Sequence, residues 1–397
     1  MDKRKRVAVL FGGRSVEHEI SIITGLQLIN ALDAERFEPL AVYVAHNGRW
    51  YVGDALLDRK FYKGLPGALE ALQQVALLPV PGLGGLLPVS KSGVIRMDDR
   101  IPVDVFFPAF HGSYGEDGCV QGLLELAGVT YTGSGVLASA VGMDKFVAKS
   151  IASSGGIPVL PGCLVRRDEL DGGLAAVRRR ILETPGLGSF PLFVKPCSSG
   201  SSVGISRAGS EGELDAALLR VFDVDLLALV EPCVVDPLEI NVSVLDGRVI
   251  RASVVEIPLA EGGGLLTYEQ KYMRRGGTKG GTLAEGMAGA SRVIDPADLP
   301  AELKSRATAY AIDVFRLLRC SGVARVDFLC DARKDAIYFN EINTLPGSLA
   351  YYLWAKTRPR LLYTELLNEI IEQAERQSGQ RAQLRRDFGF KSLSASG

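Results

Sequence analysis

The chain lacks any apolar run long enough to cross a membrane. No stretch of its 397 residues approaches the roughly 18 consecutive apolar residues that a transmembrane helix needs. The first residues, MDKRKRVAVLFGG, also contain no apolar segment followed by a small-residue cleavage site. We therefore expect a cytoplasmic protein with no membrane partner.

An excess of charge is absent as well. The 45 basic and 46 acidic residues leave a formal charge of −1, so no broad positive field exists for nucleic acid. The six cysteines are scattered without the CxxC spacing of zinc sites, and we expect reduced thiols that pack as small hydrophobic groups. We therefore expect no nucleic-acid partner.

The length favours several domains, because single cores stop growing below this size. Residues 1–142 begin with a buried strand, a glycine pair and an apolar-periodic helix, which indicates an open parallel α/β domain. Residues 143–239 and 240–376 mix strands and helices as two α+β units, the second opening with a hairpin at Asp246-Gly247. The Gly/Pro/Leu-rich stretch 64–93 has no clear periodicity. The polar residues 377–397 are predicted to be a disordered tail.

Two neighbouring strand segments near the end of the chain carry paired polar residues. Strand alternation places Arg325 and Asp327 on one face, and Glu341 and Asn343 share a face of the partner strand. If the strands form a hairpin, two carboxylates and an amide oxygen converge, a ligand set that suits Mg²⁺. A solvated surface hairpin would have the same pattern, so these residues alone leave both interpretations open.

Two further segments are candidates for ligand contacts. Lys195 leads from a strand into the small-residue loop CSSGSSVG, whose backbone could approach phosphate; a flexible surface loop is the alternative. His111 lies in HGSYGEDG at the carboxyl end of a predicted parallel strand, where open α/β sheets bind ligands, although a lone histidine is often structural.

A third segment, Gly133 to Ala138, matches the glycine pattern of dinucleotide-binding turns. The acidic residue expected about 20 positions later is missing, which disfavours a dehydrogenase.

Taken in order, the motifs resemble the D-alanine–D-alanine ligase family, which has the three-domain ATP-grasp fold. The segments that carry the resemblance are GGRSVEHEIS, HGSYGEDG, QGLLELAGVTYTGSGVLASAVGMDK, the Lys195 strand with SGSSVG, and NEINTLPGS. The resemblance implies ATP-dependent joining of two D-alanines through D-alanyl phosphate, for peptidoglycan precursors and hence the cell wall. It also implies Mg²⁺ or Mn²⁺, and a homodimer.

The resemblance also assigns residues. Those for ATP are Lys145, Lys195, Ser201, Ser202, Glu231, Pro232, Val234, Glu239 and Lys271. Those for the metal are Asp327, Glu341 and Asn343. Those for catalysis are Glu17, Ser201, Tyr272, Arg325 and the backbone N–H of Gly347. Those that contact the substrates are Glu17, His111, Arg325, Gly347, Ser348 and Tyr352.

The second substrate is less firmly implied. Tyr272 accompanies dipeptide formation in the family and favours an amine nucleophile over D-lactate. Tyr352, however, stands where the family commonly has a serine that binds the second carboxylate, which leaves D-serine open. The alternatives are an ATP-grasp ligase for other substrates and a non-catalytic nucleotide-binding protein. The first is disfavoured by HGSYGEDG and the Glu17 loop, and the second by the complete set of metal and lysine residues.

Overall fold

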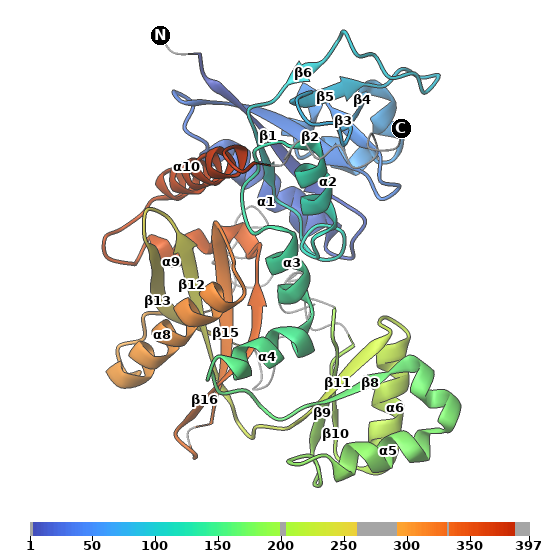
Figure 1. The fold of residues 1–397 in the computed structure, drawn as a ribbon, viewed down its shortest axis with the longest axis vertical. Helices are drawn as coiled ribbons and strands as arrows, with labels where there is room; N and C mark the ends of the chain where they lie inside the picture. The colour runs from blue at the N-terminus through green and yellow to red at the C-terminus, as the bar shows by residue number, and fades with distance from the viewer. Residues whose placement is uncertain (1–2, 199–203, 260–291, 332, 386–397) are drawn as a thin grey trace, which may run out of the picture.

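The computed structural model describes residues 3–198, 204–259, 292–331 and 333–385. Three sheets organise these residues, and each belongs to a different unit (Figure 1). The N-terminal unit lies at the top of Figure 1, the C-terminal sheet below it, and the central sheet beside the C-terminal one. The glycine-rich stretch Gly262 to Gly289, which its sequence predicts to be a mobile loop, lies outside the described residues.

The N-terminal sheet is mixed, which corrects the prediction of a parallel sheet. Its order is β6-β5-β4-β3-β2-β1-β7, and only β2, β1 and β7 are parallel. The other pairs are antiparallel, and β4 and β5 come from the stretch 64–93, whose four-residue strands are too short to show a period. The strands are β1 (Lys5–Gly12), β2 (Phe37–Val44), β3 (Trp50–Val52), β4 (Gln73–Ala76), β5 (Gly85–Pro88), β6 (Ile101–Pro102) and β7 (Val105–Pro108).

Helices cover both faces of the parallel part of this sheet. Val7, Val9 and Phe11 of β1 pack with α1 (His18–Ala31), whereas Ala8 and Leu10 pack with α2 (Cys119–Ala127). A strand buried on both faces reads as a continuous apolar run, as Val7 to Phe11 does. Between β3 and β4 lie the short helices η1 (Asp54–Leu57), η2 (Phe61–Gly64) and η3 (Gly67–Ala71).

The central unit is an antiparallel sheet with its own core. Its order is β10-β9-β11-β8, and helices α5 and α6 pack against it. Its elements are β8 (Cys163–Arg166), η4 (Arg167–Gly172), α5 (Leu174–Glu183), β9 (Leu192–Pro196), β10 (Ser206–Ala208), α6 (Glu211–Phe222) and β11 (Leu227–Pro232).

The C-terminal sheet is also antiparallel, in the order β14-β13-β12-β15-β16, and both predicted hairpins are confirmed. One face packs against α8, α3 and α4 in a hydrophobic core, which leaves the other face for polar residues. The elements are α3 (Val136–Met143), α4 (Lys145–Ser154), β12 (Leu238–Asp246), β13 (Ile250–Pro258), β14 (Arg292–Ile294), α8 (Ala301–Leu317), β15 (Val323–Asp331) and β16 (Ala336–Asn343).

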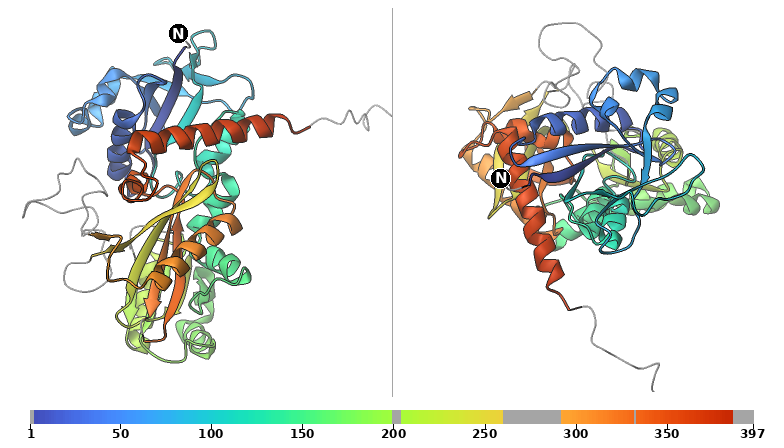
Figure 2. Two further views of the ribbon diagram at one scale, coloured as in Figure 1. Left: turned by 90° about the vertical axis from the view of Figure 1, so that its left-hand side faces the viewer. Right: turned by 90° about the horizontal axis from the view of Figure 1, so that it is seen from above.

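The last helices join the C-terminal sheet to the N-terminal unit. After β16 come η6 (Gly347–Ala350), α9 (Tyr351–Trp354) and α10 (Tyr363–Ala382). Residues of α9 and α10 share one hydrophobic core with α1, β1 and the ends of β12 and β15. Figure 2 shows α10 lying across the boundary between the two units. The N-terminal and C-terminal sheets are therefore packed as one assembly.

Helix α10 also continues past residue 377, where we predicted the start of a disordered tail. Thr130 Oγ1 donates to Ser378 Oγ at 2.9 Å, Gln377 Nε2 donates to Ser321 Oγ at 3.2 Å, and Arg381 pairs with Glu125. Polar contacts thus hold the end of this helix, and a low apolar content could not reveal them. Residues 386–397 lie outside the described part of the chain.

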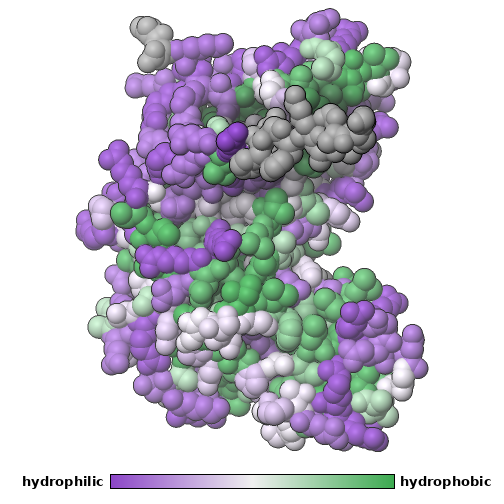
Figure 3. Space-filling model, in the orientation of Figure 1, coloured by the Kyte–Doolittle hydropathy of each residue, from purple (hydrophilic) through white to green (hydrophobic). Residues whose placement is uncertain are grey.

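The face seen in Figure 3 has hydrophilic residues toward its margins and an apolar strip near the junction of the units. Figure 3 shows hydrophobic residues gathered over α3, where Val136 and Leu137 are exposed. The six cysteines are free, as expected. Within the described ranges, no helix has the length and apolar character of a membrane span.

Replacing Ile370 by alanine should destabilise the shared core. Its side chain is 1% exposed in α10 and packs with β1 and α1. We expect the free energy of unfolding to fall by roughly 2–5 kcal/mol, as for other large-to-small core changes. Urea unfolding measures this, with the exposed Gln380→Ala in the same helix as a control that should change little. Equal stability of the two variants would contradict the shared core.

Candidate active site

A buried polar cluster in the N-terminal unit contains two predicted substrate residues. Glu17, at the start of α1, is 5% exposed, and an ideal Cβ on Gly112 would lie 2.9 Å from its Oε2 atom. His111 Nε2 lies 2.9 Å from Thr24 Oγ1, and its Nδ1 lies 3.6 Å from Glu116 Oε1. The structure thus brings Glu17 and His111 together at the carboxyl end of the parallel strands, where His111 was predicted to lie.

The electrostatics of this cluster favour a charged histidine. Burial alone would lower the pKa of His111, but the carboxylates of Glu116 and Glu17 outweigh it and raise the pKa above its ordinary value. A protonated His111 suits a negatively charged substrate group. Glu116 also accepts a hydrogen bond from the Gly112 backbone N–H at 2.9 Å. The same carboxylate therefore contacts the His111 ring and the backbone of the next residue in the HGSYGEDG loop.

The second part of the site is the polar face of the C-terminal sheet. Arg325 pairs with Asn343 and Asp327 with Glu341 in the β15–β16 register, so the four predicted side chains do share one face. Arg325 makes two hydrogen bonds of 2.7 Å to the carboxylate of Asp327. Asn343 Nδ2 donates to the same carboxylate at 3.2 Å. The hairpin geometry expected from alternation is therefore present.

A third group is the set of lysines that face this sheet. Asp144 caps α4 by accepting the Val147 N–H at 3.0 Å, which fixes Lys145 in the first turn. From there, Lys145 Nζ lies 3.3 Å from Glu341 Oε2. Lys195 comes from the central sheet and donates to Asn340 Oδ1 at 3.2 Å, at a bulge of β16. Helix α4 and the central sheet thus each contribute a lysine to the same part of β16.

Glu231 joins two of these lysines in a buried triad. It was predicted at the adenine hinge, and its side chain, 1% exposed, forms ion pairs with both Lys195 and Lys149. Burial alone would raise the pKa of Glu231, but the two ammonium groups hold it below its usual range. Burial in turn lowers the pKa of Lys149 to about 8. Lys149 was missed in the sequence, although its i,i+4 spacing from Lys145 places both on one helix face.

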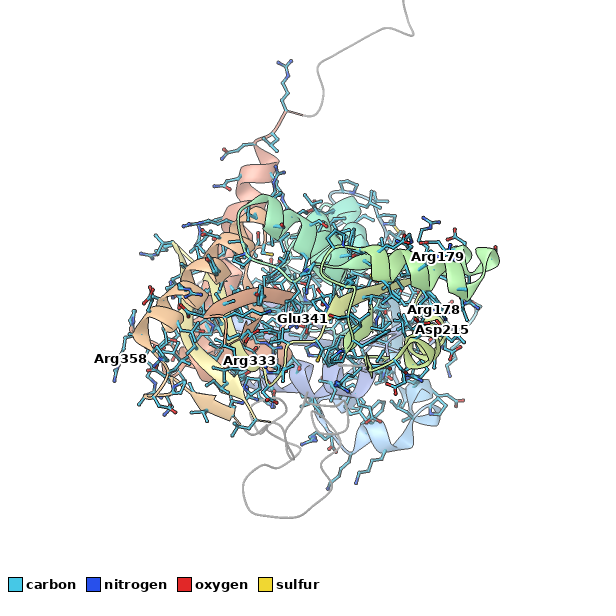
Figure 4. All side chains as sticks on the ribbon, turned by 90° about the horizontal axis from the view of Figure 1, so that it is seen from below. Arg178, Arg179, Asp215, Arg333, Glu341 and Arg358 are labelled. Carbon is cyan, nitrogen blue, oxygen red and sulfur yellow. The ribbon has the colours of Figure 1, made fainter. Side chains whose placement is uncertain are left out.

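A pocket connects the three groups. It is lined by Glu116 from the N-terminal unit, Lys145 from α4, and Glu341 and Asn343 from β16. Figure 4 places Glu341 between the C-terminal sheet and the central unit. The carboxylates that would face a metal are therefore next to the lysines that would face phosphate.

The NTLPG turn after β16 leads into a strained segment. Ser348, Leu349 and Ala350 have φ angles of 50°, 52° and 50°, in the left-handed region that costs non-glycine residues energy. Ser348 Oγ donates to Gln27 Oε1 at 2.8 Å, which ties this segment to α1. Tyr352 follows, with its hydroxyl donating to Glu256 Oε1 at 3.3 Å and its ring under the Arg292 guanidinium at 3.9 Å. Neither Glu256 nor Arg292 was predicted.

Of the remaining predicted residues, three lie in the described part of the chain. Pro232 ends β11, Val234 follows it, and Glu239 lies on β12, on the polar face of the sheet. Four predicted residues lie outside the described part of the chain, namely Ser201, Ser202, Lys271 and Tyr272.

Three of the predicted side chains could act as ligands of a metal ion. Among the described residues, no three His, Cys, Asp or Glu side chains form a closed cage. Two carboxylates and an amide do suit Mg²⁺, which takes its other ligands from phosphate and water. Asp327, Glu341 and Asn343 therefore fit a metal that arrives with a nucleotide.

The glycines from Gly133 to Gly135 have a structural role. An ideal Cβ on Gly322 would lie 2.9 Å from the Gly133 Cα, and Ser134 Oγ donates to the Ser321 carbonyl at 3.3 Å. The turn therefore packs against the start of β15, and close backbone contact explains its small residues.

Two antiparallel sheets, joined where Lys195 of one meets Asn340 of the other beside the carboxylates of the polar row, are the arrangement of an ATP-grasp ligase. Residues 6–134 match the family described as D-ala D-ala ligase N-terminus, and residues 151–372 match D-ala D-ala ligase C-terminus. The chain belongs to the D-alanine–D-alanine ligase family and is an ATP-dependent ligase.

Individual relatives are similar over almost the whole chain. The D-alanine–D-alanine ligase A of Bradyrhizobium diazoefficiens is 39% identical over 393 residues, covering 98% of this chain and 100% of that protein. The ligase of Heliobacterium modesticaldum is 37% identical, covering 93% and 94%. The structure of the D-alanine-D-alanine ligase of Coxiella burnetii aligns with a TM-score of 0.76 at 29% identity, covering 96% of each chain. The VanG D-Ala:D-Ser ligase of Enterococcus faecalis aligns with a TM-score of 0.74 at 27% identity, covering 94% and 100%.

If Arg325 has the oxyanion role that the resemblance implies, replacing it by alanine should reduce kcat by about 10²–10³-fold, the usual effect of losing such a donor. Arg325→Lys keeps the charge without the two-pronged geometry and should be intermediate. The matched control is Arg333→Ala in the turn of the same hairpin, where an exposed arginine lies 3.6 Å from Asp331. Steady-state phosphate release measures the effect, and equal losses in both alanine variants would refute a special role for Arg325.

Replacing Glu231 by glutamine should destabilise the protein and weaken ATP binding. The change leaves Lys149 and Lys195 buried without their shared carboxylate, and breaking a buried pair costs about 3–5 kcal/mol. Thermal unfolding with and without ATP measures both effects. Asp168→Asn, which removes an exposed ion pair to Arg166, is the control and should leave unfolding unchanged. An unaltered Glu231→Gln protein would show that the triad is not needed.

Proposed function

We propose that this chain joins two D-alanines with ATP and Mg²⁺ or Mn²⁺, for peptidoglycan precursors in the cytoplasm. The observation that carries the proposal is the convergence of Arg325, Asp327, Glu341 and Asn343 on one sheet face, next to Lys145. Residues 1–142 recognise the first D-alanine, residues 143–239 bind ATP, and residues 240–376 share the ATP site and add the metal and oxyanion sites. As in other members of the family, the active form is a homodimer.

The first step transfers the γ-phosphoryl group of ATP to the carboxylate of the first D-alanine. Glu17 pairs with the ammonium group of that D-alanine, and His111 lies by its carboxylate. The buried positions of both residues exclude water from the reacting group. The products are ADP and an acyl phosphate, a mixed anhydride that hydrolyses readily.

The nucleotide is held by charge and by backbone groups. Lys145 and Lys195 face its phosphates, Glu239 its ribose, and the backbone at Pro232 and Val234 its adenine. Asp327, Glu341 and Asn343 would hold a metal ion there, which would supply positive charge against the phosphates. Four residues outside the described ranges, namely Ser201, Ser202, Lys271 and Tyr272, complete the proposed set.

In the second step the amine of the second D-alanine attacks the acyl carbon, a tetrahedral oxyanion forms, and phosphate leaves. Arg325 and the Gly347 backbone N–H donate to this oxyanion, because both lie where the polar sheet face meets the NTLPG turn. Ser348 and Tyr352 follow this turn and border the second substrate.

D-Serine is a second candidate for the attacking amino acid. Tyr352 replaces the serine common in the family, and the chain is similar in structure to a D-Ala:D-Ser ligase. D-Alanine remains favoured by the identity to D-alanine–D-alanine ligases over nearly the full chain.

A phosphate-release screen tests the substrate assignment. Each assay contains ATP, Mg²⁺ and D-alanine, with D-alanine, D-serine or D-lactate as the variable second substrate, and mass spectrometry identifies the product. We expect D-alanyl-D-alanine to dominate and chelation by EDTA to abolish turnover. Equal phosphate release with and without D-amino acids would refute the ligase assignment, and a dominant D-lactate product would refute the amine nucleophile.

A further inference from the structure

The ring of His18 closes the loop that carries Glu17. His18 Nδ1 lies 2.6 Å from the Gly13 carbonyl oxygen, and its Nε2 lies 3.0 Å from the Tyr43 hydroxyl oxygen on β2. Gly13 directly follows β1 and His18 is the first residue of α1, so the first of these contacts spans the whole loop. His18 is 5% exposed and Tyr43 is 2% exposed. The ring therefore fastens the loop to the neighbouring strand from inside the protein.

The backbone on both sides of Glu17 is held within the same loop. The Glu17 N–H donates to Ser15 Oγ at 3.1 Å, and the Glu17 carbonyl accepts from the Ser21 N–H at 3.0 Å. At the start of the loop, the Gly13 N–H donates to the Val44 carbonyl at 2.7 Å. His18 follows Glu17 directly in the chain, so a shift of the His18 ring is passed to Glu17 through one peptide bond.

The two contacts of the ring require a neutral imidazole with its proton on Nδ1. The Gly13 carbonyl can only accept, so Nδ1 of His18 donates to it and Nε2 accepts from the Tyr43 hydroxyl. Burial raises the pKa of Tyr43 to about 12, so this hydroxyl keeps its proton. A second proton on His18 would turn both ring nitrogens into donors and break the hydrogen bond that Tyr43 donates.

The surroundings of the ring oppose a positive charge. The His46 ring, in the turn between β2 and β3, stacks on the His18 ring with centroids 3.9 Å apart and planes 22° apart. His18 also lies in the first turn of α1, where the helix dipole disfavours cations. Burial lowers the pKa of His18, and His46 lowers it further, whereas the Gly13 hydrogen bond and the Glu19 carboxylate offset only part of this effect. The titratable and charged groups around the ring are Arg14 and Glu17 of the loop, Glu19 of α1, Tyr43 of β2, His46 of the turn, and Tyr62 of η2 behind Tyr43.

The direction of the pH effect follows from the lowered pKa of His18. Above about pH 6.5, the ordinary pKa of histidine, the ring is neutral and the loop keeps both hydrogen bonds. As the pH falls through the lowered pKa, the ring gains a proton and the bond from Tyr43 is lost. Glu17 then loses the support of the residue that follows it.

We propose that neutral His18 is the positioning residue of Glu17, and that protonation of His18 in acid weakens the binding of the first D-alanine. The inference rests on the proposed ligase function, in which Glu17 pairs with the ammonium group of that substrate. It adds an acid limit that belongs to the first D-alanine, whereas the KM of ATP, which binds at the other two sheets, should not follow it.

The first experiment measures the protonation of His18 by NMR. The chain has three histidines, so His18→Asn and His46→Gln assign the ring C2–H signals of His18, His46 and His111. We expect the pKa of His18 below about 6.5 and that of His111 above it. His46→Gln removes the stacked ring and should raise the pKa of His18. A pKa of His18 at or above its ordinary value, or no titration before the protein unfolds in acid, overturns the proposal.

The second experiment measures the KM of the first D-alanine as the pH falls. Phosphate release is fitted over D-alanine concentration, which resolves the first KM from the second. We expect the first KM to be about twice its neutral-pH value where half of His18 is protonated, and to keep rising below that pH. His18→Asn can still donate to Gly13 but cannot take up a proton, so its first KM should be raised at neutral pH and stay level in acid. An equal acid rise in both proteins, or an equal rise in the KM of ATP, overturns the proposal.

A third variant tests the hydroxyl that His18 accepts. Tyr43→Phe keeps the ring but removes the hydrogen bond to neutral His18, so the pKa of His18 and the pH at which the first KM begins to rise should both increase. The matched control is Tyr51→Phe, because Tyr51 is buried on β3 and paired with Tyr43 in the sheet. Equal shifts in the two variants would show a general effect of the buried tyrosines and overturn the proposal.

Failure of this inference is distinguishable from failure of the proposed function. A wild-type protein without D-alanine-dependent phosphate release refutes the ligase function. An active ligase whose first KM is the same in the wild type and in His18→Asn at every pH refutes only the role of His18. If His18→Asn does not fold, His46→Gln decides the matter, because His46 is exposed and its loss should move the acid rise of the first KM to higher pH.

Discussion

The antiparallel pairing of β12, β15 and β16 positions most of the polar side chains in the candidate active site. Successive residues of a strand point to opposite faces, so burying Val326 and Phe328 against α8 forces Arg325 and Asp327 to the other face. A slip of one residue in the register would exchange the two sets. The hydrophobic core on one side of the sheet and the row of polar side chains on the other therefore have a common cause.

Charge in the site is balanced by pairs within the protein. Arg325 pairs with Asp327, Lys145 with Glu341, and Glu231 with two lysines, so few buried charges face the pocket alone. Buried ions require such partners because their desolvation is costly. A nucleotide with its metal brings charges of both signs. When the two bind, phosphate can take the place of a carboxylate partner and the metal can take the place of a lysine or arginine partner, so each buried charge keeps a partner.

The packing of the last helices holds the N-terminal unit against the C-terminal sheet. The cluster around Glu17 borders the N-terminal sheet, and Arg325 lies on the C-terminal sheet. The two are held together because α9 and α10 share a hydrophobic core with α1 and β1. Ser348 adds a direct hydrogen bond to Gln27 of α1. The central sheet has a separate core, and it contacts β16 through Lys195 and α4 through Glu231.

The sequence by itself determined the features that depend on local periodicity: the two hairpins, the shared face of Arg325, Asp327, Glu341 and Asn343, and the family motifs. Only the tertiary structure decided the mixed N-terminal sheet, the full length of α10, and the contacts of Glu231 and Glu256. Lys149 and Glu231 are 82 positions apart, and Glu256 and Tyr352 are 96 apart. A strand's alternation says which face a side chain occupies, but the partner it meets there depends on how distant segments pack.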